Sequence, residues 1–150
     1  MTNALMKADT RLLVSVVALF VWDDQVLLLH QITPPEPDLW DLPGGRLEVD
    51  EDLLTGLRRE INEELGLTMF QVERLLTVAE NFYLEEDHSL HKLDIIYQCR
   101  VAAQPTQFTP IDLTEIGPQG IQWHAVNTLT ADLCTRRTWA ALQAAQLVET

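Results

Sequence analysis

Three glutamates, Glu60, Glu63 and Glu64, have the spacing that places carboxylates side by side on one helix face. Residues three and four apart are neighbours on a helix, and like charges at that spacing repel each other by roughly a few tenths of a kcal/mol per pair. A hard cation such as Mg²⁺ suits such a cluster, because it takes carboxylate oxygens and leaves positions for water and substrate phosphate. The alternative is a plain acidic helix face, which is common on acidic proteins.

The wider spacing around these glutamates favours the first interpretation. Five residues separate Gly45 from Glu51, seven more precede Arg59, and residues 59–67 read REINEELGL. This arrangement resembles the Nudix box, G-x5-E-x7-R-E-U-x-E-E-x-G-U, where U is a bulky aliphatic residue. All nine specified positions match, and a chance match somewhere in a 150-residue chain is rarer than about one in a million.

The resemblance implies a fold of the α/β class, an α/β/α sandwich with a mixed β-sheet. The box would form a loop–helix–loop that holds metal ions. By the same resemblance Glu60, Glu63 and Glu64 are expected to be metal ligands, joined by the carbonyl of Gly44. The expected ion is Mg²⁺, with Mn²⁺ as an alternative.

The remaining box residues are expected to support that site. Arg59 belongs to the catalytic set implied by the resemblance, and together with Glu51 it would orient the helix and its carboxylates. Gly45 and Gly66 would allow turns that a side chain would obstruct.

The implied reaction is hydrolysis of a pyrophosphate bond in a nucleoside diphosphate linked to another group. A bound metal ion helps such a reaction by neutralising phosphate oxygens and activating water. A nucleoside triphosphate or a related small nucleotide is the preferred substrate, and dinucleoside polyphosphates, ADP-ribose and nucleotide sugars are the alternatives. A non-catalytic nucleotide-binding module of the same fold and an acidic protein-interaction domain are competing functions.

The general base cannot be placed by the box alone, because members of the family use different glutamates. Glu115 lies in a loop rich in glycine and proline before a predicted strand, in a position that resembles the downstream glutamate of some members. An exposed loop acid is the alternative interpretation. Four other acidic residues are rivals for the role: Glu80, Glu85, Glu86 and Asp87.

Substrate contacts are expected from residues outside the box. Tyr83 lies near the position where a tyrosine marks some dinucleoside polyphosphate hydrolases, and His91 begins a predicted strand from which it could reach a phosphate or a base. Trp40 precedes the glycine pair and could face the substrate, although packing beneath the loop is the favoured interpretation.

Hydrophobic patterning predicts the elements that hold these residues. Apolar runs predict strands at 12–22, 25–31, 71–80, 92–102 and 121–126. Apolar residues at three- and four-residue steps predict helices at 52–65 and 128–148. Asp50 is the expected N-cap of the first helix, and Gly66 is its expected C-terminal cap.

Composition limits the partners. One Nudix domain is expected over residues 1–150, with a flexible leader at 1–10. The formal net charge of −13, from 23 acidic and 10 basic residues, argues against nucleic-acid polymers and anionic membranes. A small phosphorylated partner remains possible if metal ions supply positive charge, and the resemblance implies that this partner is a small nucleotide. The chain is expected to be a monomer or a homodimer. Two distant cysteines, Cys99 and Cys134, suggest buried free thiols and a cytoplasmic location.

Overall fold

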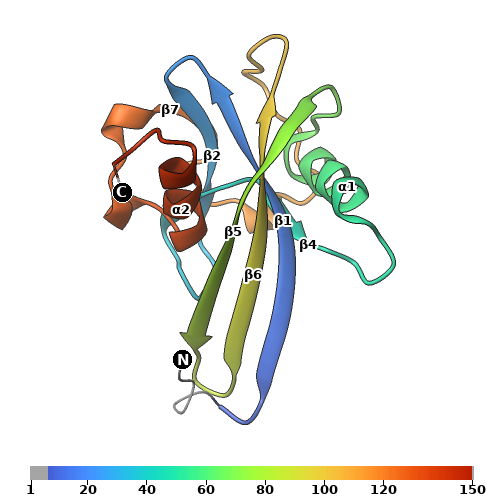
Figure 1. Ribbon diagram of the computed structural model, residues 1–150, viewed down its shortest axis with the longest axis vertical. Helices are drawn as coiled ribbons and strands as arrows, with labels where there is room; N and C mark the ends of the chain where they lie inside the picture. The colour runs from blue at the N-terminus through green and yellow to red at the C-terminus, as the bar shows by residue number, and fades with distance from the viewer. Residues whose placement is uncertain (1–6, 150) are drawn as a thin grey trace.

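The computed structural model describes residues 7–149, which form a mixed seven-stranded sheet between two helices (Figure 1). The main strand order is β3-β2-β1-β6-β5, and β4 and β7 pair with β1 and β2. β1 and β6 run parallel, and the other pairs are antiparallel. The strands are β1 (Thr10–Trp22), β2 (Gln25–Gln31), β3 (Leu39–Asp41), β4 (Gly44–Arg46), β5 (Gln71–Leu84), β6 (Ser89–Arg100) and β7 (Ile121–Ala125).

The two helices are α1 (Leu53–Leu65) and α2 (Arg136–Ala144), and they cover opposite faces of the sheet. Alternate residues of β1 face the two layers, so that Val16 packs with α1 and Val17 packs with α2. The predicted α/β/α sandwich is therefore confirmed. In the part of the chain that the structure describes, no helix is long and apolar enough to cross a bilayer.

The start of α1 differs from the prediction, whereas its end agrees. The N-cap is Asp52 and not Asp50, because the Asp52 side chain accepts a hydrogen bond of 2.9 Å from the backbone N–H of Thr55. The helix ends at Gly66, whose φ of 68° lies in the left-handed region. A Cβ at Gly66 would also lie 2.0 Å from the hydroxyl oxygen of Thr109, so two constraints favour glycine there.

The C-terminal helix is shorter than predicted. The predicted span of 128–148 contains α2, with nine residues, preceded by a 3₁₀ turn at Ala131–Leu133. Leu129 and Leu133 fit the helical spacing but lie outside α2: Leu129 is buried in a loop, and Leu133 is exposed in the 3₁₀ turn. The predicted leader at 1–10 lies mostly outside the described residues, and β1 already begins at Thr10.

The strand predictions agree in position but differ in extent. β5 continues four residues past its predicted end at 80, and β6 starts at Ser89 instead of 92. Two strands were not predicted, β3 and β4, which have three residues each on either side of Pro43. Such short strands carry too few residues for an alternating pattern to be recognised.

Candidate active site

The C-terminal half of α1 lies against β4. Two glycines of β4, Gly44 and Gly45, let the helix carboxylates come close to the strand backbone. The backbone N–H of Gly44 donates a 2.7 Å hydrogen bond to a carboxylate oxygen of Glu64. A Cβ at Gly45 would lie 2.3 Å from a carboxylate oxygen of Glu60. Gly44 has a φ of 137° and leaves no room for a Cβ, which would lie 2.2 Å from the Val16 carbonyl oxygen.

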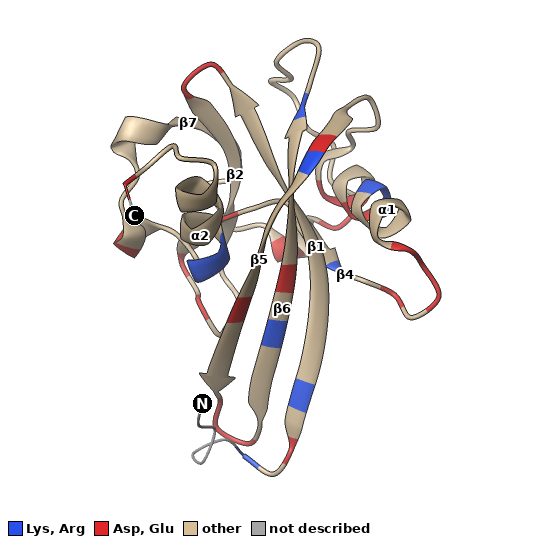
Figure 2. Ribbon diagram, viewed as in Figure 1, with Lys and Arg blue, Asp and Glu red and all other residues tan. Residues whose placement is uncertain are grey.

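Arg59 organises the acidic groups around this junction. It donates hydrogen bonds of 2.9 Å to Glu51, 2.9 Å to Glu60 and 3.2 Å to Glu63. The hydrogen bonds from Arg59 and from the backbone N–H of Glu48 lower the pKa of Glu51 to about 2. Glu51 is therefore a fixed anion that holds the loop before α1 to the helix, where acidic residues gather (Figure 2).

The two glutamates next to β4 have raised pKa values. Burial raises the pKa of Glu64 to about 8, against the stabilising N–H of Gly44, and the nearby charge of Asp41 adds to the rise. Burial also raises the pKa of Glu60, and Arg59 opposes this rise. These carboxylates lie where a positive charge would stabilise their ionised forms.

The donor set fits a hard divalent cation. Glu60, Glu63 and Glu64 supply carboxylate oxygens, which are the ligands that Mg²⁺ prefers. Within residues 7–149, no group of three His, Cys, Asp or Glu side chains is already gathered as a ready-made metal site. Arg59 engages one oxygen of Glu60 and one of Glu63, which leaves the second oxygen of each carboxylate without a bond to the guanidinium.

A polar cavity of about 230 Å³ lies beside Glu64. Glu115, in a 3₁₀ turn at Leu113–Glu115, lines it together with Glu64 and Gly44, so the structure brings the loop glutamate and the box to one cavity. The other lining residues come from β2, the loop after it, β3, β6 and α2: Leu29, Gln31, Thr33, Pro34, Pro35, Asp41, Lys92 and Arg137.

The rival acids for the role of general base lie elsewhere. Glu80 on β5 forms a 2.7 Å contact with the imidazole of His91. Residues 85–87 form part of the β5–β6 turn, at the end of the sheet near Thr10 (Figure 1). Of the five candidate acids, the structure brings Glu115 to the cavity.

The three predicted substrate-binding residues make contacts outside this cavity. The hydroxyl of the buried Tyr83 donates to the carboxylate of Glu36. Trp40 packs its ring 4.1 Å from the ring of His124, as the packing interpretation predicts. His91 stacks on Phe82 at 4.3 Å between ring centres, and its substrate role stays a prediction.

A buried ion-pair network at the cavity was not predicted. Arg137 of α2 donates to Asp41 of β3, at 2.9 and 2.8 Å, and to Asp94 of β6, at 2.9 Å. Burial acts to raise the pKa of Asp41, but the charge and hydrogen bonds of Arg137 outweigh it and lower the pKa. One feature of the sequence points to this network: Asp94 places a charge among the apolar residues Leu93, Ile95 and Ile96 of a predicted strand.

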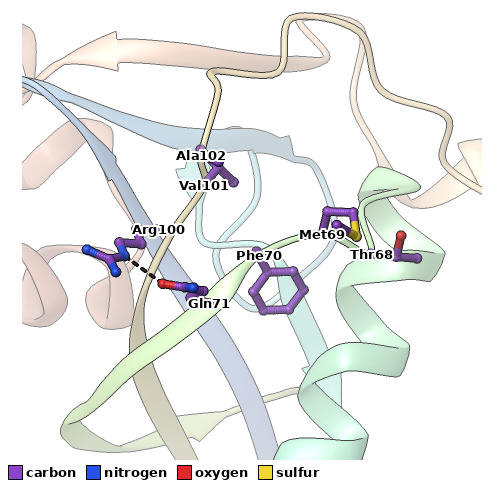
Figure 3. Close-up of a pocket in the computed structure, with 7 residues that line it drawn as sticks. All are labelled: Thr68, Met69, Phe70, Gln71, Arg100, Val101 and Ala102. Atoms are coloured by element: carbon purple, nitrogen blue, oxygen red, sulfur yellow. Dashed lines mark hydrogen bonds between the residues drawn. The ribbon is translucent and has the colours of Figure 1, made fainter.

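A larger cavity, of about 490 Å³, lies near the start of β5 and the end of β6 (Figure 3). Its lining contains no carboxylate and is mostly apolar: Thr68, Met69, Phe70, Gln71, Arg100, Val101 and Ala102. Glu64 and Glu115 line the smaller, polar cavity and not this one.

Comparison with known proteins gives a family match over most of the chain. The family model described as the NUDIX domain matches residues 11–145. A MutT-like protein of Streptomyces ambofaciens is 41% identical over 68 residues, which are 45% of this chain and 42% of that protein. An 8-oxo-dGTP diphosphatase of Buchnera aphidicola is 39% identical over 46 residues, 31% of this chain and 35% of that protein. The chain thus spans less than half the length of the curated relatives it matches.

Solved structures of similar fold align with nearly the whole chain. A MutT NUDIX hydrolase from Burkholderia pseudomallei is 26% identical, with a TM-score of 0.71 over 89% of this chain and 98% of that chain. A UDP-X diphosphatase is 27% identical, with a TM-score of 0.62 over 96% of this chain and 67% of that chain.

Proposed function

The chain belongs to the NUDIX domain family, and from this premise we propose that it hydrolyses the pyrophosphate bond of a nucleoside diphosphate joined to another group. The observation that carries the proposal is the junction of α1 and β4. There Glu64 and Glu60 lie against Gly44 and Gly45, at the edge of a polar cavity that Glu115 also lines.

Glu60, Glu63 and Glu64, with the carbonyl of Gly44, would hold Mg²⁺, with Mn²⁺ as an alternative. When bound, such an ion supplies positive charge to phosphate oxygens and activates water. The proposal is supported by the oxygen donors and by the raised pKa values of Glu60 and Glu64, which mark a place where cationic charge is stabilising.

The chain's own residues have three roles in this proposal. Glu115 accepts a proton from the attacking water, because its carboxylate lines the same cavity as Glu64 and comes from a separate loop. Arg59 and Glu51 hold the loop before α1 in place and orient the carboxylates on the helix. The backbone N–H of Gly44 fixes one oxygen of Glu64.

We propose a nucleoside triphosphate or a related small nucleotide as the substrate. Relatives named 8-oxo-dGTP diphosphatase, from Buchnera aphidicola and Proteus vulgaris, support this class. The net charge of −13 favours a small anion, whose charge a few metal ions can neutralise, over a polymer. Dinucleoside polyphosphates, ADP-ribose and nucleotide sugars are the other substrates to test.

A substrate panel tests the activity. Nucleotide and phosphate release are measured for canonical and oxidised nucleoside triphosphates, nucleotide sugars, ADP-ribose and dinucleoside polyphosphates, with Mg²⁺ and with EDTA. We expect release that depends on Mg²⁺ and is strongest for one triphosphate class. Silence across the panel from folded protein would contradict hydrolysis and favour a non-catalytic binding module.

A further inference from the structure

Two cationic side chains line the polar cavity, and only one of them is committed to protein carboxylates. Arg137 is held by Asp41 and Asp94 through ion pairs of 2.8 and 2.9 Å. Lys92, on β6, makes no ion pair within 4 Å among residues 7–149. Its ammonium lies 5.9 Å from the centre of the Tyr83 ring.

The Lys92 ammonium is partly buried and has no ion-pair partner among the described residues. Lys92 is partly buried, and desolvation, followed by the nearby charge of Arg137, lowers its pKa. Asp94, Asp41 and Glu36 act in the opposite direction, from beyond ion-pair distance. A half-buried ammonium without an anionic partner carries a desolvation cost that a bound anion would offset.

We propose that Lys92 binds a phosphate group of the substrate in this cavity. The proposal rests on the proposed function and adds a residue that lies outside the Nudix box. Lys92 comes from β6, whereas Glu64 comes from α1, so the ammonium approaches the cavity from a different element than the box carboxylates. It supplies a compact positive charge to the phosphate, as lysines do at other phosphate sites.

The size of the cavity indicates which part of the substrate Lys92 contacts. Its volume of about 230 Å³ is smaller than the roughly 300–1,000 Å³ of pockets that enclose a drug-sized ligand. Its walls are polar, with three carboxylates and two cations: Asp41, Glu64, Glu115, Lys92 and Arg137. The cavity therefore accommodates the diphosphate, and Lys92 acts on substrates independently of their base.

The composition of the chain makes a direct test simple, because Lys7 and Lys92 are its two lysines. Protein labelled with ¹³C at the lysine Cε gives two lysine signals, which a Lys7→Met variant assigns. The probe is methylenediphosphonate, a non-hydrolysable pyrophosphate analogue, titrated with excess Mg²⁺. We expect the Lys92 signal to shift saturably while the Lys7 signal stays in place. Saturable binding of the probe without a shift at Lys92 would overturn the proposal.

Variants provide a second readout. Calorimetry should show about tenfold or greater weakening of methylenediphosphonate binding in Lys92→Met, the scale of one lost charge-assisted hydrogen bond. Lys92→Arg, which keeps the charge, should stay within about threefold of wild type. Lys7→Met is the matched control, because it removes the same charge from an exposed position, and it should bind the probe as wild type does.

The outcomes separate this proposal from the proposed function. Wild-type hydrolysis together with unchanged probe affinity in Lys92→Met overturns the role of Lys92 alone. A wild-type protein that neither hydrolyses the panel nor binds the probe overturns both proposals. If Lys92→Met does not fold, as circular dichroism would show, the lysine signals of the wild-type protein still decide the question.

Discussion

Replacing Arg137 with Met should destabilise the fold strongly, because it would leave two buried carboxylates without their cation. Asp41 is 6% exposed and Asp94 is 2% exposed, and Arg137 donates three hydrogen bonds to them. Removing one partner of a buried ion pair costs about 3–5 kcal/mol, since an uncompensated charge remains in a poorly solvated place. We expect a loss of that size in the free energy of unfolding at pH 7.

The neighbouring Arg136 provides a matched control. Arg136 is exposed, and its guanidinium lies 4.8 Å from the centre of the Tyr83 ring. An exposed cation–π contact contributes about 0.5–1 kcal/mol, so Arg136→Met should cost about that much. Urea unfolding followed by fluorescence of the four tryptophans measures both variants against wild type.

The destabilisation caused by Arg137→Met should depend on pH. In the wild type the pKa of Asp41 lies below its ordinary value of 3.8, so its stabilising contribution is present above that pH and is lost as the pH falls through the folded-state pKa. In Arg137→Met, burial would lose its largest opponent, leaving the Thr135 hydrogen bond and the charge of Lys92, and we expect the Asp41 pKa to rise above the unfolded value. The destabilisation should then be full at pH 7 and diminish as the pH falls towards 4.

Two results would refute this reasoning. The first is a loss for Arg137→Met no larger than that for Arg136→Met at pH 7. The second is a stability difference between wild type and Arg137→Met that widens from pH 7 to pH 5. Either result would mean that Asp41 and Asp94 are solvated well enough to remain charged without Arg137.

Three further predictions concern the carboxylates. Glu64→Gln should cut the rate of hydrolysis, measured by kinetics, by at least about a hundredfold. The free energy of unfolding of the metal-free protein at pH 8, measured in urea, should stay unchanged or rise, because the substitution removes a carboxylate whose pKa burial raises to about 8. Gly45→Ala should lower the rate by about tenfold or more, since its Cβ would displace the Glu60 carboxylate; a rate near wild type would remove this contact from the account. Glu115→Gln should slow turnover by about a hundredfold, whereas Glu80→Gln should stay within about twofold, and the reverse order would exchange their roles.

The box and its helix could be predicted because their information is local. Regular spacing defines the buried stripe of α1, and the carboxylate spacing defines its polar face. The N-cap was misplaced because Asp50, Glu51 and Asp52 are three consecutive acids, each able to accept a backbone N–H. The choice is made by the fold, in which Arg59 engages Glu51 and leaves Asp52 to cap the helix.

The remaining cavity residues could not be predicted because topology brings them together. Asp41, Asp94 and Arg137 belong to β3, β6 and α2, and no sequence spacing relates them. The sequence alone gives Lys92 no distinguishing pattern, because it is one charged residue near the start of a strand. Alternation along β6 points Lys92 and His91 to opposite faces. The lysine consequently faces the cavity, and the histidine contacts Glu80.

Mn²⁺ binding tests most directly whether the box carboxylates hold the divalent cation. Electron paramagnetic resonance measures free Mn²⁺ during titration of wild type, of Glu60→Gln/Glu64→Gln, and of the control Glu85→Gln/Glu86→Gln. We expect wild type and the control to bind Mn²⁺ equally, and the box variant to lose about tenfold or more in affinity. Equal binding by all three proteins would contradict the account.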